Sequence, residues 1–170
     1  MKSIDIANAL IIGYGDKLAL TNLKLNKLVY FAQVESVRDD GSALFDDQVE
    51  AWRFGPVTRG VYDAFKRYGR GTITAPSGPV DIDSRSGRII AHVASTYGKM
   101  SAFDLVTLSH REGGAWSNVY SPYADNPITV EDIKDSADMN GFPGLAGTVA
   151  ESIDAVASSI PNALKLLRNS

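Results

Sequence analysis

The most informative segment of this chain is Glu50-Ala51-Trp52-Arg53-Phe54-Gly55-Pro56-Val57, which continues as a patterned sequence to Gly69. Glycine reaches backbone angles that other residues avoid, and proline, with a fixed φ and no N–H, suits the first turn of a helix. Apolar residues then recur at helical spacing, at Val57, Val61, Phe65 and Tyr68. The segment therefore predicts a short strand, a Gly55-Pro56 turn and an amphipathic helix over 57–68, and it contains no recognisable reaction centre.

Helical patterns flank this segment on both sides. We predict a first helix from Ser3 to Tyr14, because the glycines at positions 13 and 15 weaken its end. Thr21 is a candidate N-cap for a longer central helix that carries a buried apolar stripe and stops at 39–42. Further helices are predicted over 89–97, from 101 to about 112, and over 129–136, the last two with capping-box sequences at their starts.

Together these patterns predict a mainly α fold, namely a compact helical domain with a small β-hairpin or short sheet. The residues from Phe45 to Phe54 are predicted as irregular or short strand, and Ile73 with 80–82 is a candidate hairpin beside it. At Met139 the composition becomes rich in Gly, Ala and Ser while a helical apolar stripe continues. We therefore divide the chain into a domain at 1–138 and a C-terminal extension of two helices at 139–170.

The residue types argue against several kinds of chemistry. The chain has 170 residues and no cysteine, which excludes disulfides, thiol catalysis and thiolate metal sites and fits a cytoplasmic location. Its two histidines, His92 and His110, have no carboxylates at the spacing of a zinc site. A formal net charge of -3 gives no overall attraction to nucleic acid, and no apolar run approaches the ~20 residues of a membrane helix. We therefore predict no catalytic residue, metal or cofactor, and no membrane or nucleic-acid partner.

Three segments, in order, carry a recognisable pattern. They are Thr-Asn-Leu-Lys-Leu-Asn-Lys-Leu-Val-Tyr-Phe-Ala-Gln at 21–33, the stretch 44–69 with Glu-Ala-Trp-Arg-Phe-Gly-Pro-Val inside it, and Leu-Ser-His-Arg-Glu at 108–112 with Trp116. Together they resemble the Panacea family, also described as SocA-like antitoxins or phage-associated proteins, over roughly 3–136. The chain departs from the family pattern at Asn26, where Gln is usual, at one extra residue before Trp116, and in its C-terminal extension, which has no clear counterpart.

The resemblance implies a function as well as a fold. It implies a mainly helical domain with a small β element that acts as an antitoxin, binding and neutralising a cognate toxin protein encoded nearby. One branch of similar fold implies an alternative, an adaptor that delivers a toxin to a protease, so a protease is the second partner in that hypothesis. A third hypothesis comes from the residues alone: an uncharacterised enzyme that uses Asp46-Asp47 and His110. We favour the antitoxin, which is not an enzyme; the sequence leaves the toxin and the oligomeric state open.

The candidate partner-binding residues gather around the 50–57 segment. They are Trp52, Arg53, Phe54, Gly55, Pro56, Val57, Lys27 and Trp116. Aromatic residues and arginine dominate interface energetics, so Trp52 and Phe54 are either exposed anchors or core residues of the strand–helix junction. Strand alternation places Arg53 on the face opposite both. The structural alternatives are a solvated helix face for Lys27, a ring folded over the core for Trp116, and a bridge to backbone inside the domain for Asn26.

Overall fold

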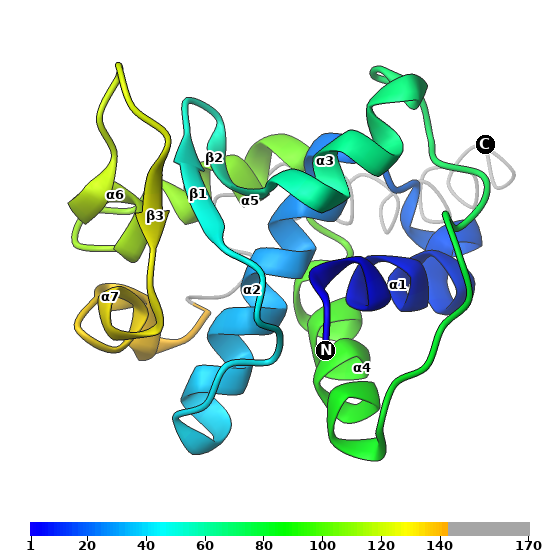
Figure 1. The fold of residues 1–170 in the computed structure, drawn as a ribbon, viewed down its shortest axis with the longest axis horizontal. Coiled ribbons are helices and arrows are strands. Elements are labelled where there is room, and N and C mark those ends of the chain that lie inside the picture. The colour runs from blue at the N-terminus through cyan, green and yellow to red at the C-terminus, as the bar shows by residue number, and fades with distance from the viewer. Residues whose placement is uncertain (143–170) are drawn as a thin grey trace, which may run out of the picture.

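The computed structural model describes residues 1–142 and confirms a mainly α fold with a small antiparallel sheet (Figure 1). The α-helices in this part of the chain are α1 (Ser3–Leu18), α2 (Asn22–Asp40), α3 (Arg59–Phe65), α4 (Ser84–Tyr97), α5 (Ala102–Ser109), α6 (Ala115–Val119) and α7 (Val130–Lys134). Two 3₁₀ helices, η1 (Lys66–Tyr68) and η2 (Ala137–Asn140), and three strands, β1 (Val49–Trp52), β2 (Gly55–Thr58) and β3 (Asn126–Ile128), complete it.

Helix α2 runs through the middle of the fold, with α1, α3 and α4 on one side and the sheet with α6 and α7 on the other (Figure 1). The Thr21 hydroxyl accepts a hydrogen bond from the Lys24 backbone N–H at 3.2 Å, and Gly41, at φ +79°, ends the helix, as the sequence predicts. Every residue from Lys24 to Val37 is buried. A helix surrounded on all sides in this way must bury polar side chains as well as apolar ones.

The predicted Gly-Pro turn and the helix start at Val57 are wrong. The turn of the hairpin is Arg53-Phe54, since Trp52 pairs with Gly55 and the antiparallel register continues to Val49 opposite Thr58. Gly55-Pro56-Val57-Thr58 is therefore strand β2, and helix α3 begins only at Arg59. Proline is compatible with this strand because β2 lies at the edge of the sheet, whose order is β2-β1-β3.

Other boundaries also differ from the sequence prediction. Helix α1 continues through Gly13 and Gly15 to Leu18, since Tyr14 and Leu18 still pack against the core and offset the ~1 kcal/mol that a helical glycine costs. Within 1–142 the third strand is Asn126–Ile128, whereas Ile73 and 80–82 form no hairpin. Both predicted capping boxes are present, at the starts of α5 and α7, and α5 ends at Ser109 rather than near 112. A fourth helix does end at Tyr97, as predicted.

The residues on both sides of the predicted boundary at 138 pack on the domain as far as the described part of the chain extends. The buried Asp138 carboxylate accepts hydrogen bonds from the Tyr30 hydroxyl, from Arg111 Nε at 2.9 Å and from the Ala115 N–H at 3.1 Å. The Phe142 ring lies 5.2 Å from the Tyr97 ring, centroid to centroid. The predicted helices of the extension lie outside the described residues. No helix within 1–142 is both long enough and apolar enough to span a bilayer.

Asp138 provides a test of this attachment. We expect Asp138→Ala to lower the free energy of unfolding by about 3 kcal/mol or more, because it leaves the Arg111 charge and the Tyr30 hydroxyl without their acceptor. Urea unfolding followed by circular dichroism measures the change. Asp135→Ala, at an exposed carboxylate three residues earlier, is the control and should stay within about 0.5 kcal/mol of the wild type. Equal losses in the two variants would contradict the prediction.

Candidate functional site

The β1–β2 turn presents an aromatic side chain on a fixed backbone. Phe54 is 60% exposed, and the Arg53 guanidinium lies 5.4 Å from the centroid of its ring. Within 1–142 the only non-glycine residue with a positive φ is Ala19, so the left-handed conformation that closes this hairpin falls on Gly55, at φ +101°. Glycine adopts that conformation without strain. The sequence Arg-Phe-Gly thus builds a tight turn and exposes its central aromatic residue.

Buried groups hold the hairpin from below. The Lys27 ammonium donates a hydrogen bond to the Pro56 carbonyl at 2.8 Å, and the Trp116 indole N–H donates to the Trp52 carbonyl, also at 2.8 Å. Gly55 packs directly on this support: a Cβ at this position would lie 2.6 Å from Lys27 Cε and 2.7 Å from Ser109 Oγ. The hairpin therefore cannot move relative to α2 and α5 without breaking these contacts.

The Lys27 side chain is an unusual residue for a protein core. It is 0% exposed, and burial lowers its pKa from 10.5 to about 7, because water no longer stabilises the ammonium. Burial, together with the nearby Lys27 charge, also lowers the pKa of His110, whose ring stacks on Trp116 at 3.6 Å. The interpretation of Lys27 as part of a solvated helix face is wrong, whereas Trp116 does lie buried, its ring between His110 and Tyr120.

The free edge of β2 is closed by side chains of α2. Along this edge Pro56 has no N–H to offer, its carbonyl accepts from Lys27, and the Thr58 N–H donates to Asn26 Oδ1 at 3.3 Å. Asn26 also donates to the Asn22 carbonyl at 3.0 Å, so the expected bridge to backbone is confirmed. These groups occupy the positions that a further strand would use.

The other edge of the sheet, β3, is blunted in a different way. On β2 the backbone groups of Pro56 and Thr58 point outward, so those of Val57, between them, point toward β1. Val57 pairs with Glu50, and the backbone groups of Glu50 therefore point toward β2. Pro127 pairs with Glu50 from the opposite side, so its backbone points away from the sheet, where proline has no N–H. Each edge strand therefore carries a proline at an outward-facing position.

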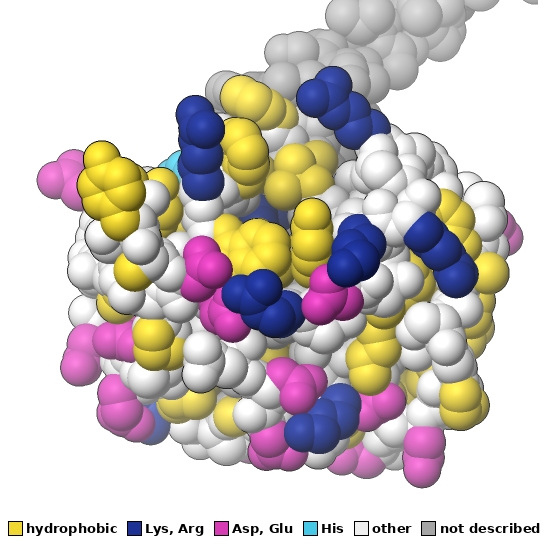
Figure 2. Space-filling view, turned by 45° about the horizontal axis from the view of Figure 1, so that its top comes forward, with side chains coloured by type: hydrophobic (Ala, Val, Ile, Leu, Met, Phe, Trp, Pro, Cys, Tyr) yellow, Lys and Arg dark blue, Asp and Glu magenta, His cyan; other side chains and the backbone are white. Residues whose placement is uncertain are grey.

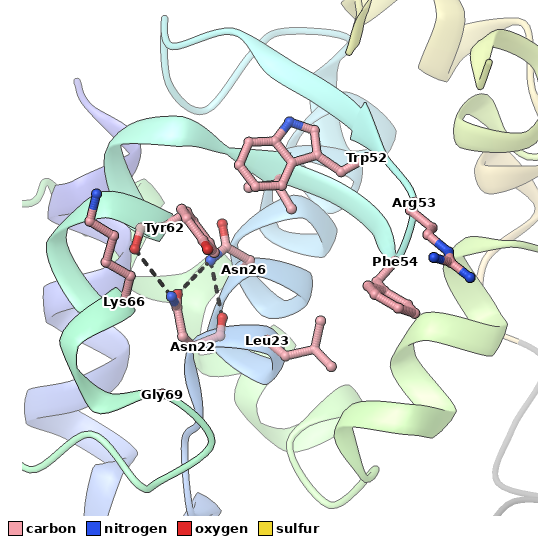
Figure 3. A pocket seen from close by; sticks show the side chains of 10 residues that line it. Asn22, Leu23, Asn26, Trp52, Arg53, Phe54, Tyr62, Lys66 and Gly69 are labelled. Atoms are coloured by element: carbon pink, nitrogen blue, oxygen red, sulfur yellow. Dashed lines mark hydrogen bonds between the residues drawn. The ribbon is translucent and has the colours of Figure 1, made fainter. Parts of the chain in front are cut away.

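A pocket of about 280 Å³ opens beside the turn (Figure 3). Its lining comes from the start of α2, the hairpin, α3 and η1: Asn22, Leu23, Asn26, Trp52, Arg53, Phe54, Val57, Tyr62, Lys66 and Gly69. Trp52 is fixed as one wall, because its indole N–H donates to Glu50 Oε2 at 2.7 Å and Tyr62 packs edge-on against it at 4.9 Å. The cavity is therefore preformed and mainly apolar.

The surroundings of the pocket are charged. Figure 2 looks onto the end of the molecule where Figure 1 places the β1–β2 turn, and it shows hydrophobic side chains gathered in the middle of this face. Lys and Arg side chains surround them, with a few acidic ones between. Arg59 lies 5.0 Å from the Trp52 ring centroid and pairs with Glu50 at 2.7 Å and Asp125 at 3.2 Å.

The predicted partner-binding residues fall into two sets. Arg53 and Phe54 are exposed and Trp52 is half-buried, whereas the remaining five residues are buried: Gly55, Pro56, Val57, Lys27 and Trp116. Arg53 does not lie on a strand face opposite its neighbours, because it belongs to the turn. Leu23 and Lys66, which line the pocket, were not among the residues predicted from the sequence. The spacing of Tyr62 and Lys66, four residues apart, could have indicated that both lie on one exposed side of a helix.

The residues of the enzyme hypothesis do not converge. Asp46 accepts from the Met1 ammonium at 3.1 Å, and Asp47 accepts from the Ser3 backbone N–H and hydroxyl at 2.6 and 2.7 Å. His110 instead stacks on Trp116. Within 1–142 no group of three or more His, Cys, Asp or Glu side chains could hold a metal ion. The hairpin, by contrast, brings an exposed aromatic side chain, a pocket and charged residues together on one face.

Comparison with known proteins identifies the family of this chain. Residues 25–117 match the family described as antitoxin SocA-like, Panacea domain. The chain is also similar to the protein named antitoxin SocA of Caulobacter vibrioides (strain NA1000 / CB15N), with 37% identity over 159 residues, covering 79% of this chain and 84% of that relative. No solved structure gives a significant match. The chain belongs to the SocA-like antitoxin family with a Panacea domain.

The tight packing at Gly55 leads to one prediction. We expect Gly55→Ala to lower the free energy of unfolding by about 2 kcal/mol or more, because its methyl group would overlap Lys27 and Ser109 and its φ is unfavourable for alanine. Gly60→Ala is the matched control: no atom lies within 4 Å of its added Cβ, and it should be neutral or stabilising by up to about 1 kcal/mol. Thermal unfolding distinguishes the two, and equal stabilities would refute the tight contact.

The buried amine of Lys27 leads to another prediction, concerning pH. The unfolded chain keeps a proton on Lys27 up to about pH 10.4, whereas the folded chain loses it near pH 7. The burial penalty is therefore fully present below pH 7 and disappears as the pH rises. The stability of the wild type minus that of Lys27→Met should rise above pH 7 by up to about 1.4 kcal/mol per pH unit.

Urea unfolding at several values between about pH 7 and pH 9 measures this slope. Lys99→Met, at an exposed lysine, is the control, and its difference from the wild type should stay flat over the same range. A flat difference for Lys27→Met as well would show that the folded protein keeps this amine charged.

Proposed function

We propose that this protein is an antitoxin that binds and neutralises a toxin protein encoded beside it, in the cytoplasm, without acting as an enzyme. One observation supports the position at which the toxin would bind. Phe54 is 60% exposed on a turn whose backbone is held by Lys27 and Trp116, next to a preformed apolar pocket. A large aromatic side chain held rigidly in water, with a cavity beside it, is typical of an interface hot spot.

The exposed and buried candidate residues have different parts in this proposal. Arg53, Phe54 and the visible face of Trp52 contact the toxin directly. Lys27, Gly55, Pro56 and Trp116 act through the hairpin by fixing its position before binding. Such preorganisation lowers the entropy that association would otherwise cost, so affinity does not depend on a large interface.

Phe54→Ala tests the proposal in cells that also express the product of the neighbouring gene. We expect the variant to lose protection and its affinity for that product to fall about thirtyfold or more, since truncating a hot-spot residue costs about 2 kcal/mol or more. Viable counts and calorimetric titration measure the two effects. Because Phe54 is exposed, the thermal stability of the variant should change by no more than about 0.5 kcal/mol.

Ile12→Ala is the matched control, since Ile12 is 61% exposed on α1 and does not line the pocket. It should protect as well as the wild type. The proposal fails if the neighbouring product is harmless alone or stays toxic beside the wild-type antitoxin. If Phe54→Ala protects fully, the contact lies elsewhere. Pulse-chase measurement of the neighbouring product separates blocking, which leaves its half-life unchanged, from delivery to a protease, which shortens it.

A further inference from the structure

The geometry points to the kind of segment that the pocket beside Phe54 receives: an apolar side chain of the partner, flanked by acidic residues. This inference rests on the proposed function, since it describes the toxin's own contact segment. The pocket, at about 280 Å³, lies just below the ~300–1,000 Å³ of ordinary small-molecule sites. It is therefore of a size for one or two side chains of a protein.

The walls and floor of the pocket select an apolar group. Its sides are Trp52, Phe54, Leu23 and Tyr62, and the buried members of its lining include Val57, Asn22 and Asn26. Asn26 has no free donor there, because its amide nitrogen already donates to the carbonyl and to the side-chain oxygen of Asn22, at 3.0 and 2.9 Å. A polar side chain entering the pocket would lose its water and gain no partner from this amide, which is unfavourable.

The amides beneath the pocket also keep its shape constant. The Asn22 side chain donates to the Tyr62 carbonyl at 3.1 Å and so ties α2 to α3 (Figure 3). Asn26 Oδ1 accepts from the N–H of Thr58, the last residue of β2, just before α3 begins. The wall that Tyr62 forms and the floor at Asn26 thus belong to one hydrogen-bonded unit. An apolar side chain entering this cavity meets a site that needs no rearrangement.

The basic residues at the rim of the pocket favour acidic residues on either side of the partner's apolar side chain. Arg53 forms no ion pair with any residue of 1–142, and the partner of Lys66, Asp63, forms only an exposed pair with it at 2.9 Å. Exposed pairs of this kind contribute about 0–1 kcal/mol, so a partner carboxylate can replace Asp63 at little cost. Because the whole chain is acidic, with a net charge of -3, this basic rim is a local feature, and its electrostatic complement is an acidic segment.

The closed sheet edges determine which groups of the protein recognise the partner's segment. A partner cannot add a strand beside β2, because Lys27 and Asn26 already occupy the outward backbone groups of Pro56 and Thr58. At β3 the outward-facing Pro127 offers no N–H. Recognition therefore proceeds through side chains at the pocket and its rim and not through backbone pairing.

Synthetic peptides test this inference on the full-length protein without any knowledge of the toxin. The probes are a nonapeptide that alternates leucine with glutamate, a second that alternates leucine with lysine, and a third that alternates serine with glutamate. The chain has two tryptophans, so its two indole N–H resonances are readily resolved. We expect only the leucine–glutamate peptide to shift the Trp52 resonance, and its binding to weaken as NaCl is raised from about 50 mM to about 500 mM.

Charge-reversal variants locate the effect. Arg53→Glu should weaken binding of the leucine–glutamate peptide about tenfold. Arg88→Glu, at an exposed arginine of α4 that lines a different pocket and has no acidic partner within 1–142, should leave binding unchanged. Equal losses in the two variants would mean a response to net charge alone and would overturn the inference. Both side chains are exposed, so both variants are expected to fold.

The outcomes distinguish this inference from the proposed function. If Arg53→Glu still neutralises the neighbouring product fully and no peptide shifts Trp52, the protein is an antitoxin but the inference is wrong. If the leucine–glutamate peptide binds at Trp52 and the neighbouring product is harmless, the pocket chemistry stands and the proposed function fails. A further probe is a single-stranded oligonucleotide of ten thymidines. If it shifts the Trp52 resonance more strongly than the peptide does, the basic rim binds nucleic acid and the inference is overturned.

Discussion

Burial of helix α2 from Lys24 to Val37 is the constraint from which the rest of this structure follows. A helix enclosed on all sides carries polar residues into the interior, and each of them must find a partner there. Lys24 donates to the Leu18 and Gly98 carbonyls at the ends of α1 and α4, and Gln33 accepts from the backbone N–H groups of Leu44 and Phe45. The polar residues of α2 thereby serve as caps for the elements packed around it.

The hairpin depends on the same helix, and this explains why two separated sequence motifs occur together. Asn26 and Lys27, adjacent on α2, satisfy Thr58 and Pro56 on β2, and Gly55 provides the space in which Lys27 fits. The surface that exposes Phe54 is thus positioned by buried polar contacts rather than by apolar packing alone. Changes in either motif are expected to be coupled, since their energies are not independent.

The elements that local sequence rules predict well are those with a local cause. Thr21, Ser101 and Thr129 start helices because their side chains bond to backbone within the same turn. Pro56 misled the prediction, because proline suits both a helix start and an edge strand, and only pairing with β1 distinguishes them. Strand β3 lies more than seventy residues after β1, with which it pairs, and the pocket combines three separated segments, so neither has a local signal.

The two outward-facing prolines, Pro56 and Pro127, also affect how copies of this chain interact with one another. A short sheet with open edges can join the sheets of other chains, and a protein that displays an exposed aromatic residue beside such an edge is at particular risk of aggregation. Here neither edge offers a free row of donors and acceptors. The protein can therefore expose Phe54 without offering an adjacent strand edge on which the sheet of a second copy could pair.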